Sequence, residues 1–164
     1  MNNDRATIGI LSDTHRSRID DEFQNQVDHA FSACDAIVHA GDLTSSSIID
    51  AFGDRPVYGF TTRSRLPDSV IFTIVGHRIG LNHGDGAGYD IEAGLMTRFP
   101  DADCIIYGHT HRPAVQRFSS VLMINPGTFR SSGRYGSPGT YAILNIDATG
   151  LSAKIHTLPA GQRT

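Results

Sequence analysis

The chain has 164 residues, a net charge of −3 and 39% hydrophobic residues. This length suits a core that needs no disulfide, and we expect residues 1–164 to form a single domain. The mildly acidic balance excludes the basic field needed for a stable nucleic-acid complex. Cys34 and Cys104 lie in apolar stretches typical of reduced core thiols. With polar first residues and no apolar run long enough for a membrane span, the sequence predicts a cytoplasmic protein.

The N-terminal third alternates short apolar strands with helical patterns. Strands are predicted over residues 7–11, 36–40 and 56–59. An amphipathic helix is predicted over residues 21–33, capped by Asp20 or Asp21, and a short helix over 45–52 that Gly53 stops. This order predicts a parallel sheet with right-handed crossovers.

After residue 66 the pattern becomes richer in strands. An antiparallel hairpin is predicted from strands 70–75 and 78–82 around Gly76-His77, followed by a helix over 91–99. Further strands are predicted over 104–107, 114–118, 121–125, 140–147 and 151–157, with a loop over 130–139. The sum predicts an α/β fold in which two mixed sheets pack face to face with helices on their outer faces.

Four predicted strands end in motifs that carry Asp or His. The motifs are Asp13-Thr14-His15, Gly41-Asp42, Asn82-His83-Gly84-Asp85 and Gly108-His109-Thr110-His111. Because ligands of open α/β sheets bind outside the carboxyl ends of the strands, we expect these motifs to converge. Each motif alone has an ordinary explanation as a turn, whereas four together indicate a metal site. The histidines at 29, 39, 77 and 156 are assigned structural roles: helix surface, hydrogen-bonded core, hairpin turn and C-terminal region.

The donor set defines the chemistry of this predicted site. Carboxylates mixed with imidazoles suit Mn, Zn or Fe better than Ca or Mg. Two ions about 3.5–4 Å apart would bind an oxygen-rich substrate and lower the pKa of a bridging water. Within Asp13/His15 and His109/His111, residues two apart on an extended segment point the same way and can serve one site.

The order DTH, GD, HG, GHTH, NPG resembles the calcineurin-like metallophosphoesterases. The closer similarity is to their small bacterial and archaeal phosphodiesterase branch, which includes the eukaryotic retromer subunit, and it covers about residues 7–157. The resemblance implies a four-layer α/β/β/α sandwich. It also implies a turn at Asn125-Pro126-Gly127 beside the site. The ligands it implies are Asp13, His15 and His111 for the first metal, Asp42 as the bridge, and His83 and His109 for the second metal.

The third strand departs from the family pattern. The family places a metal-ligating Asn followed by an acid where this chain has Phe60 and Thr61. We therefore predict weaker binding of the second metal and a preference for leaving groups that need no proton. Arginines that could bind a phosphate are Arg63, Arg65, Arg112, Arg130 and Arg134, of which Arg112 and Arg130 are favoured.

The resemblance and the donor set predict a divalent-metal-dependent phosphoesterase, by subfamily a phosphodiesterase, with a metal-bridging hydroxide as nucleophile. Asp13, Asp42, His83 and His109 are its predicted catalytic residues. The predicted cofactors are two divalent ions, Mn first, with Zn, Fe or Ni as alternatives. The predicted partner is a small phosphate ester, and a homo-oligomer is left open. The alternative function is a binding or scaffold module that has lost turnover, and a structural or redox histidine–metal protein is a remote third.

Overall fold

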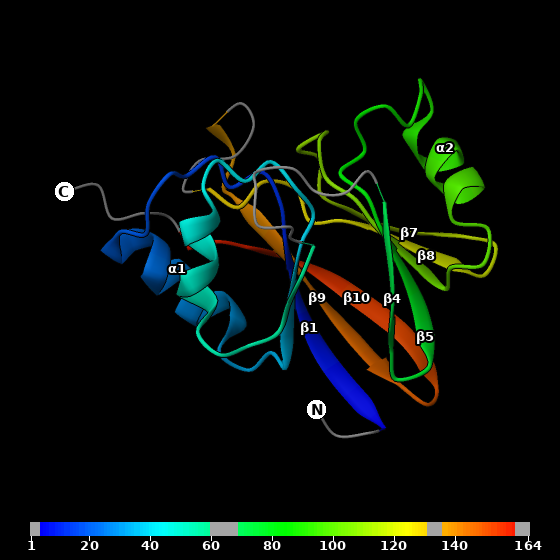
Figure 1. Ribbon diagram of the computed structural model, residues 1–164, viewed down its shortest axis with the longest axis horizontal. Helices are drawn as coiled ribbons and strands as arrows, with labels where there is room; N and C mark the ends of the chain where they lie inside the picture. Colours follow the sequence, from blue (N-terminus) through cyan, green and yellow to red (C-terminus); the bar gives the residue numbers. More distant parts are fainter. Residues whose placement is uncertain (1–3, 60–68, 131–135, 160–164) are drawn as a thin grey trace.

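The computed structural model describes residues 4–59, 69–130 and 136–159, which form two five-stranded sheets (Figure 1). In the first sheet, β1 (Arg5–Leu11), β2 (Ala36–His39) and β3 (Val57–Tyr58) run parallel, as predicted. On the other side of β1 lie β9 (Thr140–Asp147) and β10 (Gly150–Thr157), paired as an antiparallel hairpin. β1 is therefore the central strand of its sheet.

The second sheet has the order β4-β5-β6-β8-β7. Its strands are β4 (Val70–Ile74), β5 (His77–Leu81), β6 (Cys104–Ile106), β7 (Ala114–Phe118) and β8 (Val121–Asn125). The expected place of His77 in the hairpin turn was wrong, because His77 begins β5 and pairs with Ile74. Val75 and Gly76 make the turn with φ values of 48° and 78°. Positive φ at both central residues is what a two-residue hairpin turn requires.

The helices begin at short polar side chains. Asp20 caps α1 (Asp21–Phe31), because its carboxylate accepts a 2.8 Å hydrogen bond from the amide of Phe23. Ser45 caps η1 (Ser46–Phe52), a 3₁₀ helix that ends at Gly53 with φ 62°. α2 (Ile91–Arg98) is capped by Asp90 in the same way. None of the helices in these ranges is long and apolar enough to cross a membrane.

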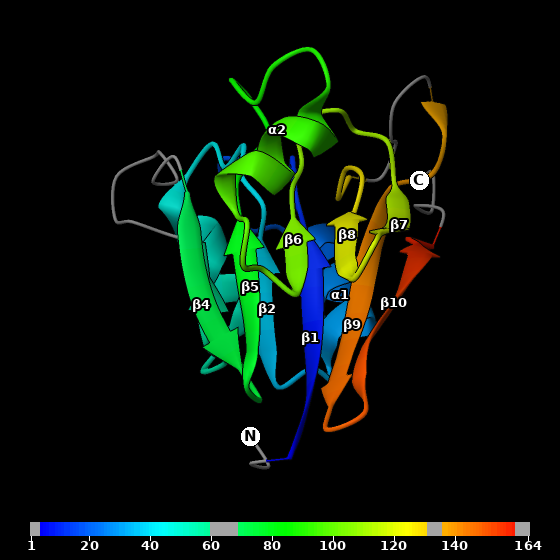
Figure 2. The same ribbon diagram turned by 90° about the vertical axis from the view of Figure 1, so that its right-hand side faces the viewer.

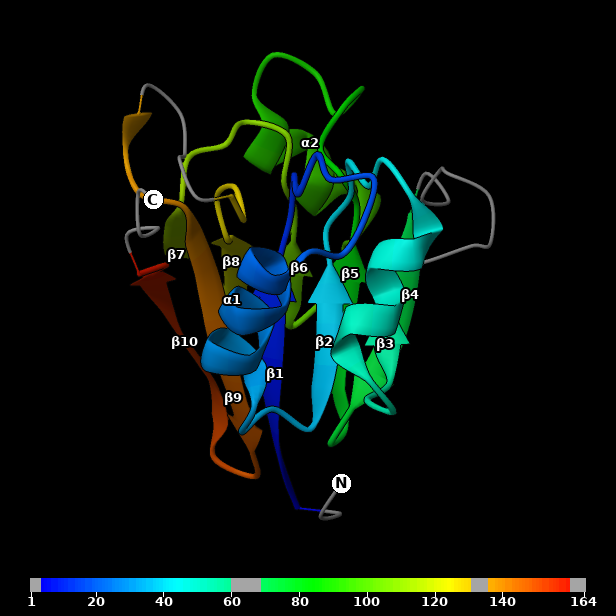
Figure 3. The same ribbon diagram turned by 90° about the vertical axis from the view of Figure 1, so that its left-hand side faces the viewer.

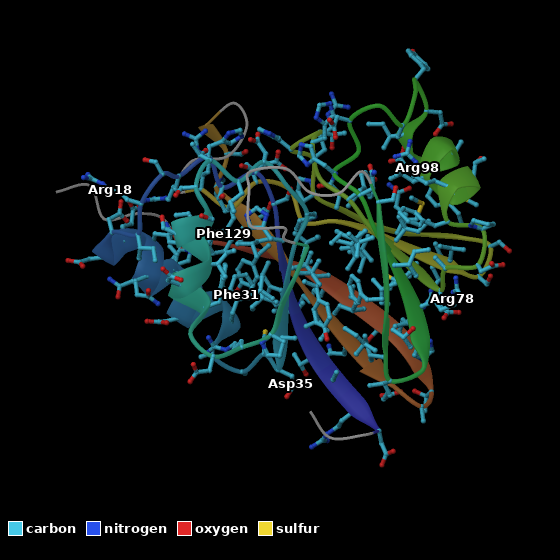
Figure 4. All side chains as sticks on the ribbon, in the orientation of Figure 1. Arg18, Phe31, Asp35, Arg78, Arg98 and Phe129 are labelled. Carbon is cyan, nitrogen blue, oxygen red and sulfur yellow. The ribbon has the colours of Figure 1, made fainter. Side chains whose placement is uncertain are left out.

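The molecule has four layers, as predicted, with α2 outside the second sheet (Figure 2) and α1 and η1 outside the first (Figure 3). The central core lies between the sheets and is formed mainly by Ile, Leu, Val and Ala. Each outer core is built around phenylalanine. Phe31 and Phe129 stack between α1 and the first sheet, with ring centroids 5.4 Å apart (Figure 4), and Phe99 fills the same place under α2.

A glycine in each sheet makes room for these rings. A Cβ on Gly9 would lie 2.4 Å from the Phe31 ring, and one on Gly80 would lie 2.7 Å from the Phe99 ring. Close packing of the helix layers therefore depends on a missing side chain in β1 and in β5. The carboxyl ends of β1, β2, β5 and β6, which carry the four motifs, open at the same edge of the sandwich (Figures 2 and 3).

Candidate metal centre

Four predicted ligands form a compact group at this edge. Asp13, His15, Asp42 and His111 each offer a ligand atom, and these atoms all lie within 4.8 Å of one another. His15 Nε2 is 3.0 Å from Asp42 Oδ2, and His111 Nε2 is 3.1 Å from Asp13 Oδ1. The first three residues follow β1 and β2, whereas His111 follows β6. The group is therefore assembled from both sheets.

Asp13 lies at the centre of the group and is fully buried. Its Oδ2 accepts hydrogen bonds from the Ser12 hydroxyl at 2.6 Å and from the His109 amide at 3.2 Å. Its Oδ1 is buried and accepts no hydrogen bond from the described residues. Leaving a charged oxygen without a donor is costly in a protein interior, and a cation would supply the missing interaction. The donor set thus fits a divalent metal.

His83 and His109 lie beside the compact group. His83 Nδ1 is 2.8 Å from the carbonyl oxygen of Ala40, to which its N–H donates, so the lone pair belongs to Nε2. That Nε2 is 3.9 Å from Asp13 Oδ1. The rings of His83 and His109 are 5.3 Å apart and nearly perpendicular. The structure therefore places the His83 imidazole near Asp13 and the His109 imidazole beside His83, in a looser arrangement than the first four residues.

The backbone at the ligands is unusual. Five of the six predicted ligands have φ values between 48° and 67°. They are Asp13, His15, Asp42, His109 and His111. This left-handed region costs a residue other than glycine about 1–2 kcal/mol, and such strain collects at functional sites. The loops are held by main-chain bonds, among them Asp13 N to Gly41 O and Gly108 N to His83 O, both 2.9 Å.

His39 links the two ligand loops of the first sheet. Its ring is fully buried, as predicted for a hydrogen-bonded core residue. The amide of Gly41 donates to Nδ1 at 3.2 Å, so Nε2 carries the proton and donates to the Thr14 hydroxyl at 3.3 Å. Burial, with a smaller contribution from His83, lowers the pKa of His39 to about 3. His39 is therefore neutral and holds the loops that follow β1 and β2 together.

Asn125 and Thr128 hold the ligand loops from the other side. The Asn125 amide donates to Gly108 O at 2.9 Å and to the Thr110 hydroxyl at 3.0 Å, while its Oδ1 accepts from Gly127 N. The Thr128 hydroxyl donates to the carbonyl oxygen of Asp13 at 2.9 Å. The predicted turn at Asn125-Pro126-Gly127 does lie beside the site. Sequence reasoning missed Ser12 and Thr128, which carry no motif of their own.

The two favoured arginines occupy different places. Arg112 lines a cleft of about 550 Å³ together with Ile91, His109, Thr110 and His111. Arg130 is exposed and is not among the described residues that line this cleft. Phe60, Thr61, Arg63, Arg65 and Arg134 lie outside the described residues.

The chain matches the calcineurin-like phosphoesterase superfamily domain over residues 7–149, so it belongs to this superfamily. It is 33% identical over 161 residues to a probable metallophosphoesterase of Methanothermobacter thermautotrophicus, covering 90% of each chain. It is 34% identical over 128 residues to a probable metallophosphoesterase of Methanocaldococcus jannaschii, covering 74% of this chain and 67% of that one. The family therefore normally binds divalent metals and hydrolyses phosphate esters.

Solved structures share the fold at low identity. Vacuolar protein sorting 29 (Vps29) of Cryptosporidium parvum has a TM-score of 0.74 at 18% identity, covering 97% of this chain and 94% of that one. Vps29 of Entamoeba histolytica, solved in complex with Zn²⁺, has a TM-score of 0.71 at 20% identity, covering 95% and 94%. A predicted phosphoesterase of Streptococcus pneumoniae has a TM-score of 0.66 at 20% identity, covering 96% and 94%. These likenesses support the four-layer sandwich.

Proposed function

We propose that the protein is a divalent-metal-dependent phosphodiesterase acting on a small phosphate ester. The observation that carries this proposal is Asp13 Oδ1, a buried carboxylate oxygen without a hydrogen-bond donor that faces imidazole nitrogens at 3.1 and 3.9 Å. A protein interior tolerates such an oxygen when a cation balances its charge. The strained backbone at five neighbouring positions supports the same function, because strain without a functional return is rarely retained.

In this proposal the six side chains hold two ions. Asp13, His15 and His111 would bind the first, His83 and His109 the second, and Asp42 would lie between them. The mixed oxygen and nitrogen donors favour Mn, with Zn, Fe or Ni as alternatives. The Zn²⁺ complex of Entamoeba histolytica Vps29 supports the view that this fold can hold such an ion.

The bound ions would neutralise the phosphoryl oxygens and lower the pKa of a water molecule between them. The chain's own residues place the donors. The hydrogen bond from His83 Nδ1 to Ala40 fixes the tautomer that directs Nε2 to the centre. Ser12 and the His109 amide fix Oδ2 of Asp13, so Oδ1 keeps one orientation. A centre held in this way binds a reacting phosphate with little rearrangement.

Tyr107, in the described part of the chain, and Thr61 are poor proton donors for a leaving group. Tyr107 directly precedes the Gly108-His109 loop, but its hydroxyl donates to Glu92 Oε1 at 2.6 Å, and burial raises its pKa well above the usual range. Thr61, where the family has an acid, is no acid near neutral pH. We therefore expect turnover to favour esters whose leaving group departs as a stable anion, such as aryl diesters.

The second candidate is a binding or scaffold module that keeps the sandwich and has lost turnover. The fold likeness to Vps29 from two organisms favours it, as does Phe60 at a usual ligand position. Against it, four of the six predicted ligands form a compact group, and five of the six have a left-handed backbone.

Metal content and turnover together separate the two candidates. We expect the wild-type protein to hold two ions after Mn loading and to hydrolyse bis(4-nitrophenyl) phosphate in a chelator-sensitive way. The Asp42→Asn variant should lose turnover by about 10²-fold or more, because it removes the proposed bridge. Asp54→Asn is a matched control, since Asp54 is exposed in the turn after η1. A wild-type protein that binds no metal, shows no turnover and captures a protein partner would establish the scaffold role instead.

A further inference from the structure

The cleft beside His109 and His111 has two different walls. Its volume is about 550 Å³, within the range of sites for small organic ligands. Ile91 supplies an aliphatic wall, and Arg112 supplies a planar guanidinium. Because two proposed ligands also line the cleft, anything bound there would lie alongside the ions.

The aliphatic wall is firmly placed. Ile91 is the first residue of α2 and packs against the core under that helix. Gly84 lies between Ile91 and the ligand loop, because a Cβ built on it would be in ordinary contact with both Ile91 Cγ2 and His109 Cβ, at 3.7 and 3.4 Å. Gly94 lets the preceding loop lie against α2, since its Cβ would meet the carbonyl oxygen of Ala87 at 1.9 Å.

The main chain of Arg112, which carries the guanidinium, is also held in place. The amide of Arg112 donates to the Thr110 hydroxyl at 3.2 Å, and that hydroxyl accepts from Asn125 at 3.0 Å. Asn125 in turn holds Gly108, so Arg112 and His109 belong to one hydrogen-bonded loop. The side chain of Arg112 is exposed and can lie flat against a ligand in the cleft.

We propose that this cleft binds the non-reacting ester group of a phosphodiester and selects a neutral aryl or heteroaryl group. This inference depends on the proposed function. In an in-line displacement the leaving group departs on the side of phosphorus away from the attacking water, so a pocket beside the ligands receives a substituent that stays. An aliphatic wall and a guanidinium plane both suit a flat ring.

A carboxylate next to the aliphatic wall narrows the choice of ester group further. Asp90 is exposed and directly precedes Ile91, so it disfavours a second anionic group, such as another phosphate, at that wall. A monoester has no group for this cleft, so the cleft also gives a physical reason for a preference for diesters.

Two substrates with the same leaving group test the assignment. Bis(4-nitrophenyl) phosphate and methyl 4-nitrophenyl phosphate both release 4-nitrophenolate and differ in the group that stays. With Ile91→Ala we expect kcat/KM for the bis-aryl ester to fall about tenfold, while the methyl ester changes less than twofold. Arg112→Lys keeps the charge but loses the planar group, and should act in the same direction. Equal effects on both substrates, or none on either, would overturn the assignment.

Matched controls and a binding measurement complete the test. Ile71→Ala and Arg98→Ala remove an exposed isoleucine from β4 and an exposed arginine from α2, and should leave the substrate ratio unchanged. Calorimetry of the Mn-loaded protein with phenylphosphonate and methylphosphonate needs no turnover. A preference for the phenyl compound that Ile91→Ala abolishes would support the cleft even if wild-type protein hydrolysed nothing, in which case the proposed function alone fails. Equal binding of the two phosphonates would overturn the cleft assignment.

Discussion

The candidate centre has two halves, the proposed first and second metal sites, and their ligands are placed with different closeness. Around Asp13, His15, Asp42 and His111, the ligand atoms lie within 4.8 Å and four strained backbone positions fix their direction. Around His83 and His109, the rings are 5.3 Å apart and His83 Nε2 is 3.9 Å from Asp13 Oδ1. The folded chain thus brings the ligand atoms of the first half together without an ion, whereas those of the second half lie further apart. We therefore expect two ions of unequal affinity.

Removing the buried aspartate at the centre of the first half should have the largest effect. With Asp13→Asn we expect kcat/KM to fall by about 10³-fold, and the first ion to be lost in a metal titration. The same change removes an unpaired buried charge, so the metal-free protein should become more stable by about 1 kcal/mol. Urea unfolding of the metal-free forms measures this. A variant that is less stable without metal yet keeps its turnover would show that Asp13 is structural.

The weaker half can be strengthened at the third strand. With Phe60→Asn, which restores the family's ligand type, we expect the second ion to bind about 10–100-fold more tightly and the first to be unaffected. In an isothermal titration with Mn²⁺, the dissociation constants of the two binding steps should differ less in the variant than in wild type. Tyr89→Asn is the matched control, because Tyr89 is a fully exposed aromatic residue. An unchanged second step in Phe60→Asn would contradict the inequality of the two halves.

The smallest expected effect is on the pH dependence of folding stability, through His39, which supports the loops of the first half. Burial lowers the pKa of His39 to about 3 in the folded chain, against 6.5 in the unfolded one. Between these values the unfolded state binds a proton that the folded state does not, so stability falls as the pH drops below 6.5. Lowering the pH from 7 to 5 should therefore cost about 1–2 kcal/mol through this residue.

The His39→Asn variant isolates that contribution. Asparagine keeps an acceptor for the Gly41 amide but has no proton to bind, so the metal-free variant should lose less stability between pH 7 and pH 5 than wild type. His29→Asn, at an exposed position on α1, is the control. Equal pH dependence of wild type and His39→Asn in urea unfolding would contradict the assignment of a neutral, buried His39.

The strand-end motifs could be predicted because parallel strands deliver their carboxyl ends to one edge of a sheet, which brings Asp13 and Asp42 near each other. The approach of His83 to them depends on how the second sheet packs on the first. The alternation of strand and helix likewise predicted the parallel arrangement of β1, β2 and β3, and the turn patterns predicted the hairpins β4-β5 and β9-β10. The insertion of β9 beside β1 could not be predicted, because pairing between residues more than 130 positions apart leaves no local pattern.

The finer parts of the site could not be predicted for a similar reason. Ser12 and Thr128 are common residue types, and their value comes from contacts with Asp13 that exist only after the sheets pack. The 3₁₀ form of η1 and the place of His77 in β5 depend on tertiary contacts and turn geometry. Weaker binding of the second ion stays a prediction from Phe60, and the distances between the ligands required coordinates.

Because the ligands come from both sheets, the ions would hold the two sheets together at the open edge of the sandwich. At the far end and along one side the sheets are already fastened without metal, by His77 Nε2 at 3.3 Å from Asp147 O and by Arg117 Nη2 donating to Leu151 O at 2.6 Å. At the open edge the hydrogen bonds from His83 Nδ1 to Ala40 O and from the His109 amide to Asp13 Oδ2 would remain without metal. A chelator would therefore loosen this edge without opening it, and amide exchange should quicken in the loops after β1, β2, β5 and β6. The same ions that polarise the phosphate would thus set how far the two sheets can part.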